Sequence, residues 1–229
     1  THTIVEVVTD DMPFLVDSLG MVINRHGLYI HLTVHPIYSV RRGRTGRLLE
    51  ILDRDGVRGA AVESFMRFEI DRESDKAIIA EIEEDLVSVL GDARAACEDW
   101  LEMRQRAVDA CRELELSPPP LNETVIAEAK AMLEWMEDDH FTFLGYREYD
   151  LVKGEDYDTV KAVPATGLGI LRRPSANKSQ ATVISRAIRR QARSRDLLLI
   201  TKANARSTVH RDGYLDYIGV KHFDKNGRV

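Results

Sequence analysis

One stretch decides how the first part of this chain folds: Asp10-Asp11-Met12-Pro13-Phe14-Leu15-Val16-Asp17-Ser18-Leu19-Gly20. The apolar run Ile4 to Val8 precedes it and predicts a strand. Asp10 or Asp11 can cap a helix, and Pro13 suits the first turn because proline lacks an N–H that would have no partner there. The sequence therefore predicts a strand that leads into a capped helix through a tight acidic turn.

The predicted helix is followed by a second strand. Its apolar positions recur at helical spacing, at Leu15, Val16, Leu19, Val22 and Ile23. Gly27 is placed to end the helix in a left-handed conformation. From Leu28 to Val34, apolar residues alternate with Tyr29, His31 and Thr33, which is the period of a half-buried strand. The unit is β-α-β.

The continuation predicts a ferredoxin-like plan without its last strand. A short arm at residues 48–52 leads to the turn 53–56, a strand spans residues 62–70, and a helix begins near Ser74. The order β-α-β-β-α covers five of the six elements of that plan. Gly91-Asp92 is expected to end this helix, and two further helices follow, the second capped by Asn122. We therefore expect a ferredoxin-like α+β domain at residues 1–90 and a helical motif at 91–138.

The last third of the chain, residues 139–229, is expected to be mostly antiparallel β. Phe141–Tyr149 and Leu197–Lys202 are predicted strands, and Asp212-Gly213 is a hairpin signal. A short basic helix is expected within 181–193. The charge distribution supports a boundary near 140–150: the chain has 38 acidic and 32 basic residues, yet none of the acidic ones lies between Asp158 and Asp196.

Composition limits the class of protein. The 229 residues are 44% hydrophobic and 31% charged, which is typical of a globular protein. No apolar run is long enough for a membrane span and no signal sequence is present, so we expect a cytoplasmic location and no membrane partner. Cys97 and Cys111 are expected on one helix, too far apart for a disulfide. Because the chain starts without methionine and stops at a hairpin signal, Asn226-Gly227, we expect it to be a piece of a longer polypeptide.

Four ordered motifs resemble the N-terminal region of the large bacterial NAD-dependent glutamate dehydrogenases. They are Val8 to Ser18, Glu63-Ser64-Phe65-Met66-Arg67-Phe68-Glu69-Ile70, Asp138 to Arg147, and Gly167-Leu168-Gly169-Ile170-Leu171. The resemblance covers essentially the whole chain. It implies an ACT-like domain, a helical motif and the start of a PAS-like domain, in a parent enzyme that oxidises glutamate to 2-oxoglutarate and ammonia with NAD. It also implies that this region is regulatory, with other domains or subunits of the parent as partners.

The residues themselves predict no catalytic, cofactor or metal site in this chain. Gly167-Leu168-Gly169 lacks the third glycine of a dinucleotide fingerprint and is better explained as a turn. His31 and His35 lie on one strand face, with His26 near, but no carboxylate or thiol stands at ligand spacing, so we interpret them as sheet-face histidines. Ser18 lacks the nucleophile-elbow pattern. We expect no dehydrogenase activity from the chain alone, and NAD only in the parent.

The acidic turn has two interpretations. Asp10 and Asp11 can satisfy the N–H groups of the helix start themselves, which would repel an anionic ligand. The alternative follows from the ACT resemblance, because ACT domains bind small amino acids at this turn, where free N–H groups can meet a carboxylate. In that case Asp10 or Asp11 would meet the ammonium group. The candidate ligand-binding residues are Asp10, Asp11, Met12 and Phe14.

A competing hypothesis is a nucleic-acid-binding module in the basic segment 159–195. A cluster of cations without an acidic residue attracts phosphates. Its members are Lys161, Arg172, Arg173, Lys178, Arg186, Arg189, Arg190, Arg193 and Arg195.

The missing closing strand also predicts an open sheet edge in the first domain. Such an edge leaves N–H and C=O groups unpaired. Either a second copy pairs with it and makes a homo-oligomer, or Phe141–Tyr149 returns to supply the strand.

Overall fold

The computed structural model describes residues 2–52, 58–172, 182–184, 186–224, 226–227 and 229. The chain divides into two compact units. The first contains Thr1–Arg94 together with Thr208–Asp212, and the second contains Ala95–Ser207 and Gly213–Val229. The expected turn at 53–56 lies outside the described residues. The division into three domains stays a prediction.

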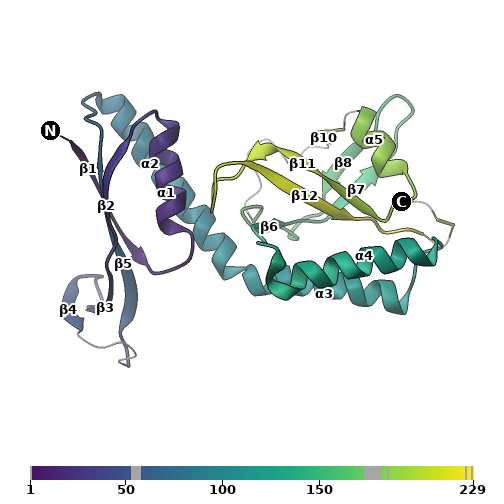
Figure 1. The fold of residues 1–229 in the computed structure, drawn as a ribbon, viewed down its shortest axis with the longest axis horizontal. Helices are drawn as coiled ribbons and strands as arrows, with labels where there is room; N and C mark the ends of the chain where they lie inside the picture. Colours follow the sequence, from purple (N-terminus) through teal and green to yellow (C-terminus); the bar gives the residue numbers. More distant parts are fainter. Residues whose placement is uncertain (1, 53–57, 173–181, 185, 225, 228) are drawn as a thin grey trace. The chain divides into compact units, whose positions relative to one another are not determined.

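The first unit is an antiparallel sheet with two helices on one face (Figure 1). Its elements, in chain order, are β1 (Thr3–Asp10), α1 (Leu15–Arg25), β2 (Ile30–Val34), β3 (Ile37–Arg42), β4 (Leu48–Leu52), β5 (Ala61–Ile70) and α2, which starts at Lys76. The long strand β5 is central: β1 pairs with one side of it, and β2 and β3 share the other side, with β4 beyond β3. The elements expected from the sequence are present up to α2, but the structure adds β3, which was not predicted and which pairs with β4 as a hairpin between β2 and β5.

The core of this unit lies between β5 and the two helices. Met66, Phe68 and Ile70 point inward from β5, as the alternation of the sequence predicts, and all three are almost fully buried. They contact the apolar side of α1, around Leu19, and that of α2, around Leu86. Gly27 does follow α1 with φ of 75°, which confirms its predicted role at the helix end.

The boundary between the second and third helices differs from the expectation. α2 spans Lys76–Glu98 and passes through Gly91-Asp92 without a break. A glycine inside a helix costs only about 1 kcal/mol relative to alanine, and the buried Ala93 and Ala96 favour continued helix at this point. The break falls at Asp99 instead. Cys97 and Cys111 therefore lie on different helices, neither forms a disulfide, and burial raises the pKa of both thiols.

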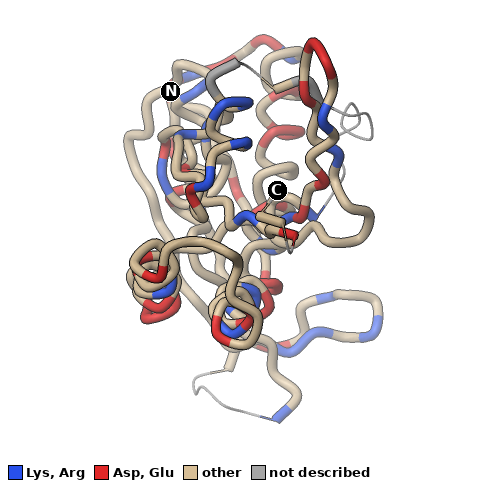
Figure 2. The backbone as a smooth tube through the Cα atoms, turned by 90° about the vertical axis from the view of Figure 1, so that its right-hand side faces the viewer, with Lys and Arg blue, Asp and Glu red and all other residues tan. Residues whose placement is uncertain are grey.

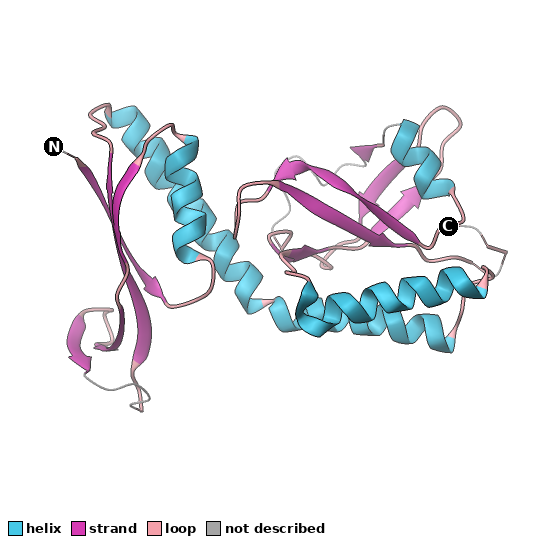
Figure 3. Cartoon of the chain, in the orientation of Figure 1, coloured by secondary structure: helices cyan, strands magenta, loops and turns pink. Residues whose placement is uncertain are grey.

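The second unit combines a helical hairpin with small antiparallel sheets (Figure 3). Its helices are α3 (Trp100–Leu116), α4 (Glu123–Trp135), η1 (Met136–His140) and α5 (Arg186–Arg193). Asn122 caps α4 as expected, since its side chain accepts a hydrogen bond from Thr124 N. The strands are β6 (Gly145–Tyr146), β7 (Tyr149–Val152), β8 (Thr159–Ala162), β9 (Leu168–Gly169), β10 (Thr182–Val183), β11 (Leu198–Arg206) and β12 (Tyr214–Val220).

The predicted long strand Phe141–Tyr149 is wrong. Phe141 and Phe143 instead pack edge to face, with ring centroids 5.2 Å apart. The extended residues that follow divide between two sheets, because β6 pairs with β9 and β7 pairs with β8. Among the described pairings, this segment therefore does not supply the closing strand of the first unit. The hairpin β11–β12 packs its Leu198 and Val220 against the core shared by α3 and α4.

Candidate functional site

The turn between β1 and α1 is built differently from the sequence prediction. Asp10 is the last residue of β1, and Asp11 N–H still donates to Val62 O of β5 at 2.9 Å, so the chain stays extended. α1 begins only at Leu15. Its N-cap is Phe14 in a left-handed conformation (φ 73°), and no side chain caps the helix. The prediction that Asp10 or Asp11 caps α1, with Pro13 in its first turn, is wrong because the pairing with β5 holds both carboxylates before the helix.

Both carboxylates have other partners. Asp10 Oδ2 lies 2.7 Å from Arg94 Nη1 of α2, and the same guanidinium donates to Thr9. Asp11 Oδ1 accepts a 2.6 Å hydrogen bond from the hydroxyl of Ser64, which is fully buried. Ser64 Oγ in turn lies 2.9 Å from His35 Nε2. Three residues from other elements thus support the turn, and local sequence patterns do not reveal them: Arg94, Ser64 and His35.

The candidate ligand residues lie together at the start of α1, in two classes. Asp10 and Asp11 are exposed, whereas Met12 and Phe14 are half-buried, and Met12 packs on the core. An uncapped helix start carries a partial positive charge and free N–H groups, which suit a carboxylate. The neighbouring Asp11 has a second oxygen for a cation. The geometry is therefore suited to a zwitterionic ligand, with its carboxylate at the helix start and its cationic group at Asp11.

The same region contains residues that are distant in sequence. Ser18 is buried in the first turns of α1, and its Oγ accepts a hydrogen bond from the backbone N–H of His210 at 3.2 Å. The rings of Phe14 and His210 lie 5.0 Å apart. We expected Ser18 to pack or hydrogen-bond within its own helix, but this contact reaches a residue outside α1.

The histidines have separate partners. His26 lies 2.9 Å from Asp85, and His31 lies 2.7 Å from Asp71. A backbone hydrogen bond from Tyr29 and the bond with His31 hold the pKa of Asp71 below its ordinary value. His31 and His35 therefore do not act as a pair, since they bond to different groups.

One cluster of potential metal ligands occurs among the described residues. Cys111 and Glu115 on α3 and Glu134 on α4 place one ligand atom each within 4.8 Å of one another. The ammonium group of Lys130 already lies 2.7 Å from Glu115. The sequence spacing gave no indication of this group, because Glu134 comes from another helix.

The glycine motif 167–169 contains the short strand β9 and leads into a tight turn, in which Leu171 N–H donates to Leu168 O. Gly169 has φ of 59°, and a Cβ atom there would lie 2.2 Å from Leu144 O. Its N–H donates to Asp99 Oδ2 at 2.7 Å, and Arg147 donates to Leu171 O across the same turn. A Cβ atom would not fit at Gly167 or Gly169, so both glycines are explained by close packing, although the motif forms β9 and only its end belongs to the turn.

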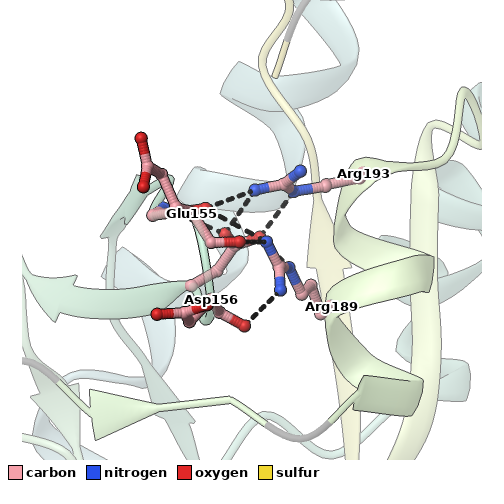
Figure 4. Close-up of polar contacts among 6 residues, drawn as sticks. Glu155, Asp156, Arg189 and Arg193 are labelled. Atoms are coloured by element: carbon pink, nitrogen blue, oxygen red, sulfur yellow. Dashed lines mark hydrogen bonds and ion pairs between the residues drawn. The ribbon is translucent and has the colours of Figure 1, made fainter.

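Several cations of the basic segment bind the protein itself. Arg189 and Arg193 of α5 point toward the turn that carries Glu155 and Asp156 (Figure 4). Arg193 donates to both oxygens of Asp158, at 2.7 and 2.5 Å, and the pKa of this fully buried carboxyl falls to about 2 chiefly because of that bond. Arg189 donates to backbone carbonyls of the same turn.

The remaining members of the proposed nucleic-acid cluster differ in their surroundings. Arg172 binds Asp99 and Glu98, and Arg195 donates to Pro120 O at 2.7 Å. Lys161 and Arg190 are exposed. Arg173, Lys178 and the side chain of Arg186 lie outside the described residues. Figure 2 marks the acidic and basic residues along the backbone. Among the described members of the cluster, Arg172, Arg189, Arg193 and Arg195 already bind other groups of the protein, which argues against one open cationic surface.

A comparison with known protein families identifies most of the first unit. Residues 1–86 match the family described as glutamate dehydrogenase, ACT1 domain. This part of the chain is a glutamate dehydrogenase ACT1 domain. Its sheet, its two helices and its β1–α1 turn are those described above.

The rest of the chain also has relatives. The full chain aligns with NAD-specific glutamate dehydrogenases from Pseudomonas aeruginosa, at 36% identity, and Halomonas elongata, at 33% identity. A similar enzyme from Mycobacterium tuberculosis is 25% identical over 77% of this chain. The chain spans 14% of the length of the first two. The names of these relatives give no support to the nucleic-acid hypothesis. No helix of the described residues is long and apolar enough to cross a membrane.

Proposed function

We propose that this chain is a regulatory and assembly region of a large NAD-dependent glutamate dehydrogenase, and that its ACT1 domain binds a small amino acid at the β1–α1 turn. The parent would oxidise L-glutamate to 2-oxoglutarate and ammonia, with NAD bound elsewhere in the enzyme. Residues 95–229, which include the expected PAS-like part, would connect this domain to other domains or subunits.

One observation carries the amino-acid proposal: α1 starts without a side-chain cap, and Asp11 stands beside it. The sequence interpretation assigned the acidic side chains to the helix N–H groups, which would have excluded a carboxylate. In the structure Asp10 is bound to Arg94 and Asp11 to Ser64, so the helix start is left to a ligand. A free amino acid has a carboxylate for the helix and an ammonium group for Asp11.

Calorimetric titration of the chain with each of the twenty protein L-amino acids tests this proposal. We expect saturable binding of at least one. Asp11→Asn keeps the oxygen that accepts from Ser64 but removes the charge, so it should weaken that binding about tenfold or more. Glu6→Gln, an exposed residue of β1 paired with Arg67, is the matched control and should leave the affinity unchanged. Absence of binding for every amino acid would reject the sensing role.

The assembly proposal rests on the free side of β1. Among the described strands β1 pairs only with β5, so its outer edge offers eight residues for pairing. Ile4 and Val8 on the face away from the helices are 40% and 49% exposed. We propose that a second copy, or another part of the parent enzyme, pairs with this edge.

A further inference from the structure

The segment Thr208–Asp212 is part of the first unit and lies against α1. Its central residue, His210, donates its backbone N–H to Ser18 Oγ and places its ring beside that of Phe14. The preceding Val209 is completely buried. The segment therefore covers the start of α1, where the amino acid is proposed to bind.

The two ends of the segment are also attached. Thr208 Oγ1 donates to Asp92 of α2 at 2.7 Å, and Arg25 at the end of α1 lies 3.1 Å from Asp212. Positions 14, 18 and 25 are four and seven residues apart, so they lie on one face of α1. The segment thus follows that face along the helix.

The conformation and surroundings of His210 are energetically unfavourable. Its φ is 77°, a left-handed conformation that is unfavourable for a residue with a side chain. Its Nδ1 is buried and has no hydrogen-bond partner within the described part of the chain. A contact that carries strain and an unsatisfied polar atom is easier to displace than one of ideal geometry.

We propose that Thr208–Asp212 is an intrachain occupant of the site at the start of α1, and that its docking and the binding of the amino acid exclude each other. This inference rests on the proposed sensing function. The peptide N–H and imidazole of His210 occupy the space beside Phe14 and Ser18 that a ligand at the helix start would need. The apparent affinity for the amino acid is then the intrinsic affinity multiplied by the fraction of molecules in which the segment is released.

The same exclusion gives the ligand a route to act on the rest of the chain. Residues 208–212 connect β11 to β12, so a ligand that releases them changes the restraint on both strands. Binding energy can shift this equilibrium only because the ligand favours the released state over the docked state.

A release variant of the full chain tests the inference. His210→Ala removes the ring and leaves an alanine in the left-handed conformation, and Thr208→Val, a second variant, removes only the hydroxyl bond to Asp92. Arg211→Ala is the matched control, because its exposed side chain lies in the same segment. Circular dichroism melting identifies any variant that fails to fold.

Two measurements are made on each protein. Hydrogen exchange of residues 14–18 should become faster in His210→Ala and Thr208→Val and remain unchanged in Arg211→Ala. Calorimetry with the twenty amino acids should show about tenfold tighter binding for the release variants. Unchanged exchange, or equal affinity in all four proteins, would overturn the exclusion while the sensing role stands. If faster exchange were seen but no amino acid bound any protein, the sensing role itself would fail.

Discussion

The carboxylate of Asp99 binds Arg172 through two hydrogen bonds, at 2.6 and 2.8 Å, and so joins the start of α3 to the turn after β9. The same carboxylate accepts the N–H of Gly169 at 2.7 Å. Its side chain is 14% exposed, whereas the second partner of Arg172, Glu98, is 51% exposed. The hydrogen bonds from Arg172 are the main reason that the pKa of Asp99 lies below its ordinary value.

Asp99→Asn should therefore destabilise the chain. The change removes the charge from a largely buried group with three hydrogen bonds, and such a loss costs roughly 1–3 kcal/mol of unfolding free energy. Urea unfolding gives the value. Glu98→Gln is the control, because an exposed ion pair contributes about 0–1 kcal/mol. Equal effects of the two substitutions would show that Asp99 has no special role.

Acid should weaken the attachment of α5 through Asp158. The folded-state pKa is about 2, below the ordinary 3.8, so the stabilisation is fully present above about pH 4 and is lost as the pH falls toward 2. Asp158→Asn should remove this part of the pH dependence. Denaturant midpoints measured from pH 6 to pH 2 should fall less steeply for the variant, and parallel curves would contradict the assignment.

Gly169→Ala should be strongly unfavourable. The new Cβ would lie 2.2 Å from Leu144 O, in a backbone conformation with positive φ. We expect a loss of more than about 1 kcal/mol in unfolding free energy. At Gly213 a Cβ meets no atom within 4 Å, so Gly213→Ala should change stability by less than about 0.5 kcal/mol. A Gly169→Ala protein as stable as the control would rule out the close-packed turn.

A charged substitution on the β1 edge distinguishes self-association from docking on another part of the parent enzyme. Val8 is half exposed, so Val8→Lys should leave the fold intact and hinder pairing between sheets. Sedimentation velocity over a concentration series should show association of the unsubstituted chain and a monomeric variant. A strictly monomeric unsubstituted chain would reject self-association and leave docking on another part of the parent.

Local patterns predicted most elements of the first unit, although β3 (Ile37–Arg42) was missed. The alternation through Met66, Phe68 and Ile70 and the stripe around Leu19 identify buried faces because burial follows strand and helix periods. The same reasoning failed at Gly91-Asp92, where the packing of Ala93 and Ala96 outweighed the low helix propensity of glycine. Propensity is a weak guide where tertiary contacts decide.

The candidate site was only partly predictable. Phe14, Asp10 and Asp11 could be placed near the helix start from the sequence, but their roles could not. Whether Asp11 caps α1 or continues the pairing with β5 depends on Val62, and the neutralisation of Asp10 depends on Arg94. His210 reaches this region from almost two hundred residues away, a relationship that no local pattern can indicate.

Binding of a small amino acid at the start of α1 can be detected residue by residue with nuclear magnetic resonance. The amide spectrum of the ¹⁵N-labelled chain would be recorded during titration with each of the twenty protein L-amino acids. We predict that at least one of them shifts, in a saturable way, the amides of residues 11, 12 and 14–18 and those of the segment 208–212, with smaller shifts along β11 and β12. Saturable shifts that leave residues 11–18 unchanged, or no shift with any amino acid, would contradict binding at the start of α1.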